Sequence, residues 1–258
     1  MKRVIFAIIV LVTVEFLITT ESVLAAGVGG PIRHLEPGEW VTGVGYDSLF
    51  DMDLSGASDA EVDRYNALYI KSAMHSFDIV TFYAKLGMAD LEYHGRIDSA
   101  DITADYNFGI YGGLGFKLDW EFQKSWWAGT DLQYAMWRSE LDSLTRDSAT
   151  ASSITGDAQT GELQWAFYAM KVYKLKDMGK ANLYLGGKLT DLKIEQSGAR
   201  YMIGTAEYTL DEDLKEDDNF FSIFGGVDIE FLSPSIIAHI EGACIGETSF
   251  STSIVYKF

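Results

Sequence analysis

A strict two-residue alternation of hydropathy over residues 106–122 constrains the fold more than any other feature of this sequence. The even positions are apolar or glycine, whereas the odd positions carry the charged residues Lys117, Asp119 and Glu121. Successive side chains point to opposite faces in a β-strand, so the pattern predicts a strand with one apolar and one polar face. Such a strand is long enough to cross a bilayer at the tilt that strands adopt in membrane barrels.

The same alternation recurs along the chain and predicts an all-β fold, a closed antiparallel up-and-down transmembrane β-barrel of about 10 strands. The other predicted strands are residues 39–47, 64–72, 78–88, 126–136, 163–175, 182–190, 221–231, 236–244 and 249–258. The barrel must close because hydrocarbon offers no hydrogen-bond partner to an open sheet edge. Eight strands remain an alternative, as do twelve if residues 200–210 span the bilayer. We expect residues 200–210 to form a hairpin in an outer loop instead.

The predicted connections alternate in length, as they do in barrels with short periplasmic turns and longer outer loops. The longer ones are residues 48–63, 95–104, 142–161 and 191–219, and the short ones are 73–77, 123–125, 176–180 and 232–235. Both termini are therefore expected in the periplasm. Aromatic residues flank the shortest turn, which predicts a girdle at the periplasmic interface; they are Trp120, Phe122, Trp126 and Trp127.

The chain ends on an alternating strand whose apolar face includes Phe250, Ile254, Tyr256 and the terminal Phe258. This ending resembles that of Gram-negative outer-membrane β-barrel proteins, and the chain looks most similar to small OmpA-like or opacity-type barrels of the porin-like group. The resemblance implies that these four residues form a signal for the barrel assembly machinery. It also implies a multi-pass location in the bacterial cell outer membrane, in contact with its lipid and lipopolysaccharide.

The N-terminus has the features of a secretory signal peptide, because Lys2 and Arg3 precede an apolar run and small residues follow at positions 22–26. A membrane anchor is the alternative, but the apolar run is shorter than a spanning helix requires. The expected organisation is a signal peptide (1–26), a periplasmic lead-in (27–38) and a transmembrane β-barrel (39–258).

The polar faces of the predicted strands place ten ionisable residues in the lumen: Lys85, Lys117, Asp119, Glu121, Asp131, Lys188, Asp228, Glu230, His239 and Glu241. Small barrels are filled by their own side chains, whereas wide channels need many more strands. We therefore expect a plug of paired charges in a barrel with a structural or surface-interaction role. A small porin or uptake channel for ions or small solutes is the alternative.

The net charge of −18 disfavours nucleic acid as a partner. Acidic residues in the predicted outer loops could hold divalent cations, although they lack the spacing of a calcium-binding loop. No cofactor or resident metal is expected. Asp90, Glu92 and His94 share one strand face near the rim, where omptin-type proteases of similar architecture carry Asp and His. Because no matching acidic pair is found, a rim hydrolase is only a distant third hypothesis. The single cysteine, Cys244, is expected to face lipid.

Overall fold

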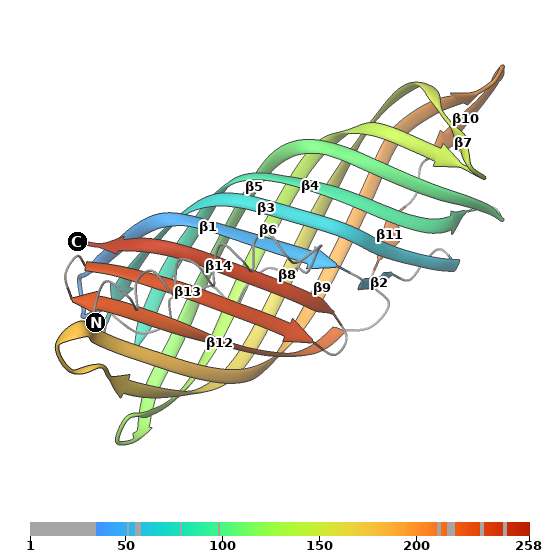
Figure 1. The fold of residues 1–258 in the computed structure, drawn as a ribbon. Coiled ribbons are helices and arrows are strands. Elements are labelled where there is room, and N and C mark those ends of the chain that lie inside the picture. Colours follow the sequence, from blue (N-terminus) through green and yellow to red (C-terminus); the bar gives the residue numbers. More distant parts are fainter. Residues whose placement is uncertain are drawn as a thin grey trace.

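The computed structural model describes residues 35–50, 52–54, 58–77, 79–97, 99–210, 213–215, 220–232, 235–244 and 247–258. These residues form a closed antiparallel ten-strand β-barrel, which confirms the predicted fold class (Figure 1). The wall strands are β1 (Trp40–Phe50), β3 (Ser58–Ser76), β4 (Val80–Ile97), β5 (Ala100–Gln123), β6 (Trp126–Arg146), β8 (Ser152–Lys174), β9 (Gly179–Ile203), β12 (Phe220–Leu232), β13 (Ser235–Cys244) and β14 (Thr248–Lys257). Sequential neighbours pair around the wall, and β1 pairs with both β14 and β3 to close it.

The two ends of the described chain lie at the same end of the barrel, together with the short turns after β3, β5, β8 and β12 (Figure 1). The turn between β8 and β9 contains a short 3-10 helix, η1 (Lys176–Met178). We call the part of the wall near the termini the near half and the opposite part the far half. The proposed signal peptide and most of the lead-in lie outside the described residues.

Most of the predicted outer loops are strands that continue the wall, which corrects the sequence-based boundaries. β4 runs to Ile97 and β5 begins at Ala100, so residues 95–97 pair directly with residues 100–102. Residues 142–161 are mainly the far ends of β6 and β8, joined through β7 (Ala149–Thr150). Alternation continues through these segments, but here the apolar side chains face inward and the polar ones outward. A search for one continuous outward apolar face therefore ends each strand too early.

Three more short strands extend the far end. β10 (Ala206–Leu210) folds back on β9, with Tyr208 paired to Tyr201, which confirms the hairpin expected for residues 200–210; its place on the outer side stays a prediction. β11 (Asp213–Lys215) also pairs with β9, and β2 (Met52–Leu54) pairs with β3. The wall is therefore uneven in height, because β13 and β14 have 10 residues each whereas β8 and β9 have 23 and 25.

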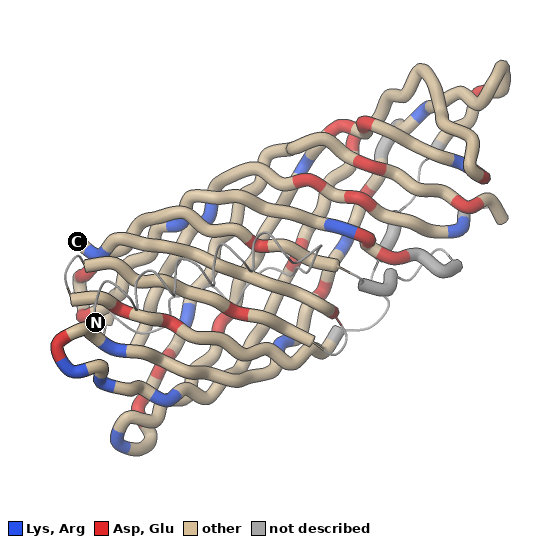
Figure 2. The backbone as a smooth tube through the Cα atoms, in the orientation of Figure 1, with Lys and Arg blue, Asp and Glu red and all other residues tan. Residues whose placement is uncertain are grey.

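The outer surface of the near half is apolar. Large side chains exposed there include Ile70, Leu86, Leu114, Phe167 and Leu185. Charged residues are frequent along the far ends of the strands (Figure 2). Among the described residues no helix is long and apolar enough to cross a membrane.

Candidate functional site

Nine of the ten ionisable residues predicted for the lumen are buried inside the near half, each no more than 3% exposed. Together with the other buried polar side chains at this level they form what we call the polar layer. Glu121 is the exception: its carboxylate is exposed and accepts a hydrogen bond from the Ser125 backbone N–H at 2.9 Å. Glu121 is directly paired with Trp127, which packs inside, so it keeps the predicted face; it is exposed because it lies at the terminal end of the barrel, where β5 turns into β6.

Asp47 is the centre of one network in the polar layer. Its carboxylate pairs with the Lys85 ammonium at 2.9 Å and accepts hydrogen bonds from Tyr69 Oη and Ser251 Oγ, each at 2.7 Å. Lys85 Nζ also lies 4.8 Å from the centre of the Tyr69 ring. These four residues come from β4, β1, β3 and β14, so the network crosses the strand pairs that close the barrel.

A second network joins β4, β5, β6 and β8. Lys117 and Asp131 are directly paired across β5 and β6, as predicted, and their charged atoms lie 3.6 Å apart. Tyr83 donates a hydrogen bond to Asp131 at 2.6 Å. Asp119 accepts a hydrogen bond from the Tyr168 hydroxyl. Removing one partner of such a buried pair leaves a charge without compensation, which is strongly destabilising.

The third network lies under the low wall of β12, β13 and β14. His239 Nδ1 is 2.6 Å from Asp228 Oδ1, and the His239 ring stacks on Tyr184. Tyr184 also donates to Glu241 at 2.9 Å. Glu230 pairs with Lys257 at 2.7 Å near the terminal end.

Several members of the polar layer escaped the sequence analysis. Asp47 lies at the end of a segment that alternates only weakly. Lys71 is buried and is the directly opposite neighbour of Lys85 on the adjacent strand. Two others are partners of residues that were predicted to face inward: Gln164 accepts a hydrogen bond from Gln133, and Glu247 pairs with Lys188. The signal for Lys71 and Gln164 is position, because each occupies the inward face of a strand whose outward face is apolar.

The far half has the opposite interior, an apolar core rich in aromatic side chains. Trp137 packs edge-on against both Tyr65 and Tyr106, and its indole N–H donates to the Ala89 carbonyl at 2.5 Å. Tyr93 stacks on Tyr106. The buried members of the apolar core are Leu49, Phe50, Val62, Tyr65, Ala67, Tyr69, Ala89, Leu91, Tyr93, Ile102, Ala104, Tyr106, Tyr111, Ala135, Trp137, Leu141, Leu144, Ala158, Leu192, Ile194, Ala199 and Tyr201.

On β5 a register shift produces this reversal. The even-numbered residues Ile102 to Tyr106 are buried inside, whereas Phe108 and Ile110, also even-numbered, are exposed outside. The β5–β6 ladder shifts between Tyr106 and Ile110, and such an irregularity changes the face to which the following side chains point. The prediction that residues 106–122 keep one outward apolar face is therefore wrong at Tyr106.

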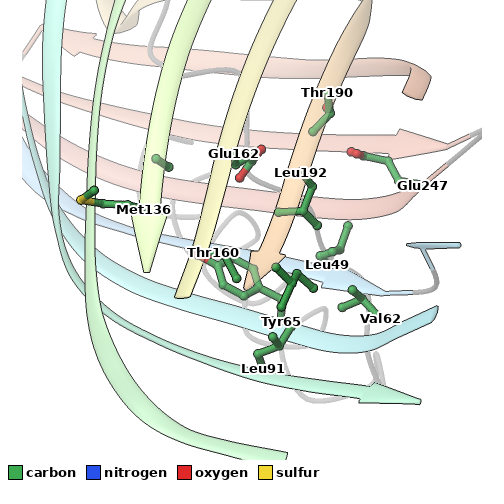
Figure 3. A pocket seen from close by; sticks show the side chains of 12 residues that line it. Leu49, Val62, Tyr65, Leu91, Met136, Thr160, Glu162, Thr190, Leu192 and Glu247 are labelled. Atoms are coloured by element: carbon green, nitrogen blue, oxygen red, sulfur yellow. The ribbon is translucent and has the colours of Figure 1, made fainter. Parts of the chain in front are cut away.

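A cavity of about 30 Å³ lies where the polar layer meets the apolar core (Figure 3). Leu49, Tyr65, Leu91 and Leu192 line it, and Glu162 and Glu247 add carboxylates. A cavity of this volume has room for about two water molecules. Both apolar side chains and carboxylates therefore bound a small space at the junction of the two layers.

Asp90, Glu92 and His94 lie on the outer face of the far half rather than in a cleft. Asp90 accepts hydrogen bonds from Asn66, Glu92 pairs with Arg64 at 3.3 Å, and His94 Nδ1 is 3.1 Å from Thr103 Oγ1. Each side chain thus has a structural partner on a neighbouring strand.

Two nearby carboxyl groups on this face have perturbed acidities. Burial raises the pKa of Asp63, and the charges of Glu61 and Glu92 add to the rise. The pKa of Asp105 is also raised, first by burial and then by Glu92, although the Arg64 guanidinium opposes the change.

The near half carries the surface expected of a membrane span. Trp120, Phe122 and Trp126 are exposed at its terminal end, in the predicted girdle. Trp127 was wrongly included in that girdle, because it packs inside against the cluster around Tyr168. Cys244 is exposed.

An apolar outer belt, a polar interior and an aromatic girdle on a closed antiparallel barrel form one consistent architecture. The chain has the fold of an outer-membrane β-barrel. Ile254, Tyr256 and Phe258 are exposed on the closing strand, Phe250 is half-buried, and their role in assembly stays a prediction.

Comparison with known proteins adds architecture only. No protein-family model matches the chain, and no curated protein matches its sequence. Among solved structures, the translocator domain of the autotransporter NalP from Neisseria meningitidis is 14% identical, with 88% of this chain and 90% of that chain covered and a TM-score of 0.49. The outer membrane protease OmpT from Escherichia coli is 8% identical, with 88% and 99% covered and a TM-score of 0.45. OprG from Pseudomonas aeruginosa is 14% identical, with 88% and 99% covered and a TM-score of 0.38.

Metal binding has no support among the described residues, which contain no group of three or more His, Cys, Asp or Glu side chains suited to hold an ion. Side chains of the acidic segments around residues 51–59 and 211–218 lie outside the described set. The expected divalent-cation contacts of those segments therefore stay a prediction.

Proposed function

We propose that this protein is a closed outer-membrane barrel with a structural and surface-interaction role. The filled interior carries the proposal: the charged side chains of the polar layer are buried and joined in networks that cross the lumen. Above them the apolar core closes the far half. In this proposal, neither layer leaves a continuous aqueous path for ions.

The test is conductance of the refolded protein in planar bilayers. The wild-type barrel is expected to give no unitary steps above those of a bilayer that received heat-denatured protein. A variant with Asp47→Ser and Lys85→Ser removes both members of a buried pair and provides a deliberately opened control. Reproducible ion-selective steps from the wild type would contradict the proposal and favour the small channel.

In this proposal the termini face the periplasm and the far half projects outside the cell. The short turns at the terminal end and the long strands at the other support this orientation. In intact cells carrying Cys244→Ala, a membrane-impermeant thiol reagent should label Ser152→Cys and spare Ser125→Cys. Labelling of Ser125→Cys alone would reverse the orientation.

A further inference from the structure

We infer that a groove on the outer wall, at the upper edge of the apolar belt, binds the sugar headgroup of a membrane glycolipid. The groove encloses about 410 Å³ and crosses β6, β8 and β9. Tyr134, Gln159, Gly161, Asp191, Lys193 and Glu195 line it. The inference rests on the proposed membrane placement and goes beyond the structural role.

Strand register brings these residues together. Tyr134 is paired with Leu163 across β6 and β8, and Leu163 is paired with Asp191 across β8 and β9. Two residues further toward the far end, Gly161 is paired with Lys193. All these positions point outward, so the groove is a property of the wall surface and is separate from the filled interior.

Gly161 creates the depression. Its neighbours on β8, Gln159 and Leu163, carry full side chains on the same face, whereas Gly161 carries none. A Cβ atom at Gly161 would lie 3.2 Å from the Tyr134 hydroxyl oxygen, so any larger side chain would occupy the space beside that ring.

The position of the groove determines which part of a lipid reaches it. Tyr134 and Leu163 are exposed at its lower edge and continue the apolar belt, where acyl chains must pack. Gln159 and Glu195 lie at its upper edge, beyond the belt. A lipid whose chains lie against the belt therefore places its headgroup in the groove.

The chemistry of the lining favours sugar hydroxyls over a phosphate. Lys193 is paired with Glu195 inside the groove, and Asp191 adds a second carboxylate. Two carboxylates beside one ammonium repel an anion. Hydroxyl groups both donate and accept, so they match carboxylate, amide, ammonium and phenol groups together, while the Tyr134 ring offers an apolar face to a sugar ring.

The experiment measures lipid retention by native mass spectrometry. The full barrel is refolded in phosphatidylcholine nanodiscs doped with a dihexosyl diacylglycerol or, in a parallel arm, with phosphatidylglycerol. Wild-type protein should retain the glycolipid in preference to phosphatidylglycerol. Gly161→Leu, which fills the groove, and Asp191→Ala, which removes a hydroxyl acceptor, should each lower glycolipid occupancy at least about tenfold.

Gly112→Leu is the matched control, because Gly112 also interrupts the outward face of the belt and a Cβ there meets no atom within 4 Å. It should retain glycolipid as the wild type does, and heat-modifiable gel mobility reports whether each variant is folded. Equal retention of phosphatidylglycerol, or unchanged retention by folded Gly161→Leu, would overturn the inference. A conducting barrel that still retains the glycolipid would instead overturn only the proposed function.

Discussion

The near and far halves of this barrel are built from the same strands with opposite interiors. On β6, Asp131 and Gln133 point inward in the near half, whereas Trp137 and Leu141 point inward in the far half. The outward face of β6 changes from apolar to charged, with Tyr134 in the near half and Arg138 in the far half. The proposed membrane placement accounts for the difference: a wall in lipid exposes apolar groups and gathers its polar groups inside, whereas a wall in water folds around an apolar core.

The largest effect should come from breaking a charge pair in the near half. Lys85→Met leaves the Asp47 carboxylate buried without its cation, which typically costs about 3–5 kcal/mol of unfolding free energy. Urea unfolding of the refolded barrel measures the loss. Leu91→Met places the same side chain in the apolar core and should cost under about 1.5 kcal/mol, because the exchange nearly conserves volume.

Adding Asp47→Asn to Lys85→Met should recover much of the lost stability, since the amide carries no charge. If Lys85→Met and Leu91→Met lowered the unfolding free energy equally, the near half would not depend on buried charge pairs in the way described.

A smaller effect should distinguish the two outer surfaces. Leu114 is exposed midway along the belt of β5, and Leu114→Arg should cost about 2–4 kcal/mol in a lipid bilayer. Glu140→Arg on the outer face of the far half should change stability by no more than about 0.5 kcal/mol, because that position faces water. Reversible unfolding in phosphatidylcholine vesicles measures both; a cost for Glu140→Arg equal to that for Leu114→Arg would place the far half in lipid as well.

The smallest effect concerns pH and is confined to the far half. The pKa of Asp105 in the folded protein is raised above its ordinary value, so the folded state binds this proton more tightly than the unfolded state. Stability should therefore fall as the pH rises from about 4 through the raised pKa and should recover on acidification. Asn resembles a protonated Asp, so the difference in unfolding free energy between Asp105→Asn and the wild type should become smaller at the acidic end of that window. A difference that does not depend on pH would contradict the raised pKa of Asp105.

Alternation alone predicted most of the near half. The outward apolar faces yielded the strand number, and the direct pairing of Lys117 with Asp131 followed from register. The prediction was strong because lipid tolerates few polar side chains, so most outward positions are apolar or glycine.

The far half was harder to predict, because its strands alternate in the opposite phase and register shifts change the face between neighbouring residues. Tyr106 and Phe108 look equivalent in the sequence yet lie on opposite sides of the wall. The sequence analysis also missed the groove. It depends on Gly161 of β8 lying directly opposite Lys193 of β9, and these residues are far apart in the sequence because the two strands form a long hairpin. A search for the residues at which the inward positions change from polar to apolar would have located the boundary between the two halves.

The uneven height of the wall has a mechanical consequence. A barrel pulled from its C-terminus in a force spectrometer should release hairpins one after another. The two strands of the β13–β14 hairpin have 10 residues each and should yield about 70 Å of extended chain, whereas the later hairpin of β6 and β8, with 21 and 23 residues, should yield about 150 Å. The first rupture should thus be the shortest and the later ones longer, so the force trace would record the profile of the wall strand by strand.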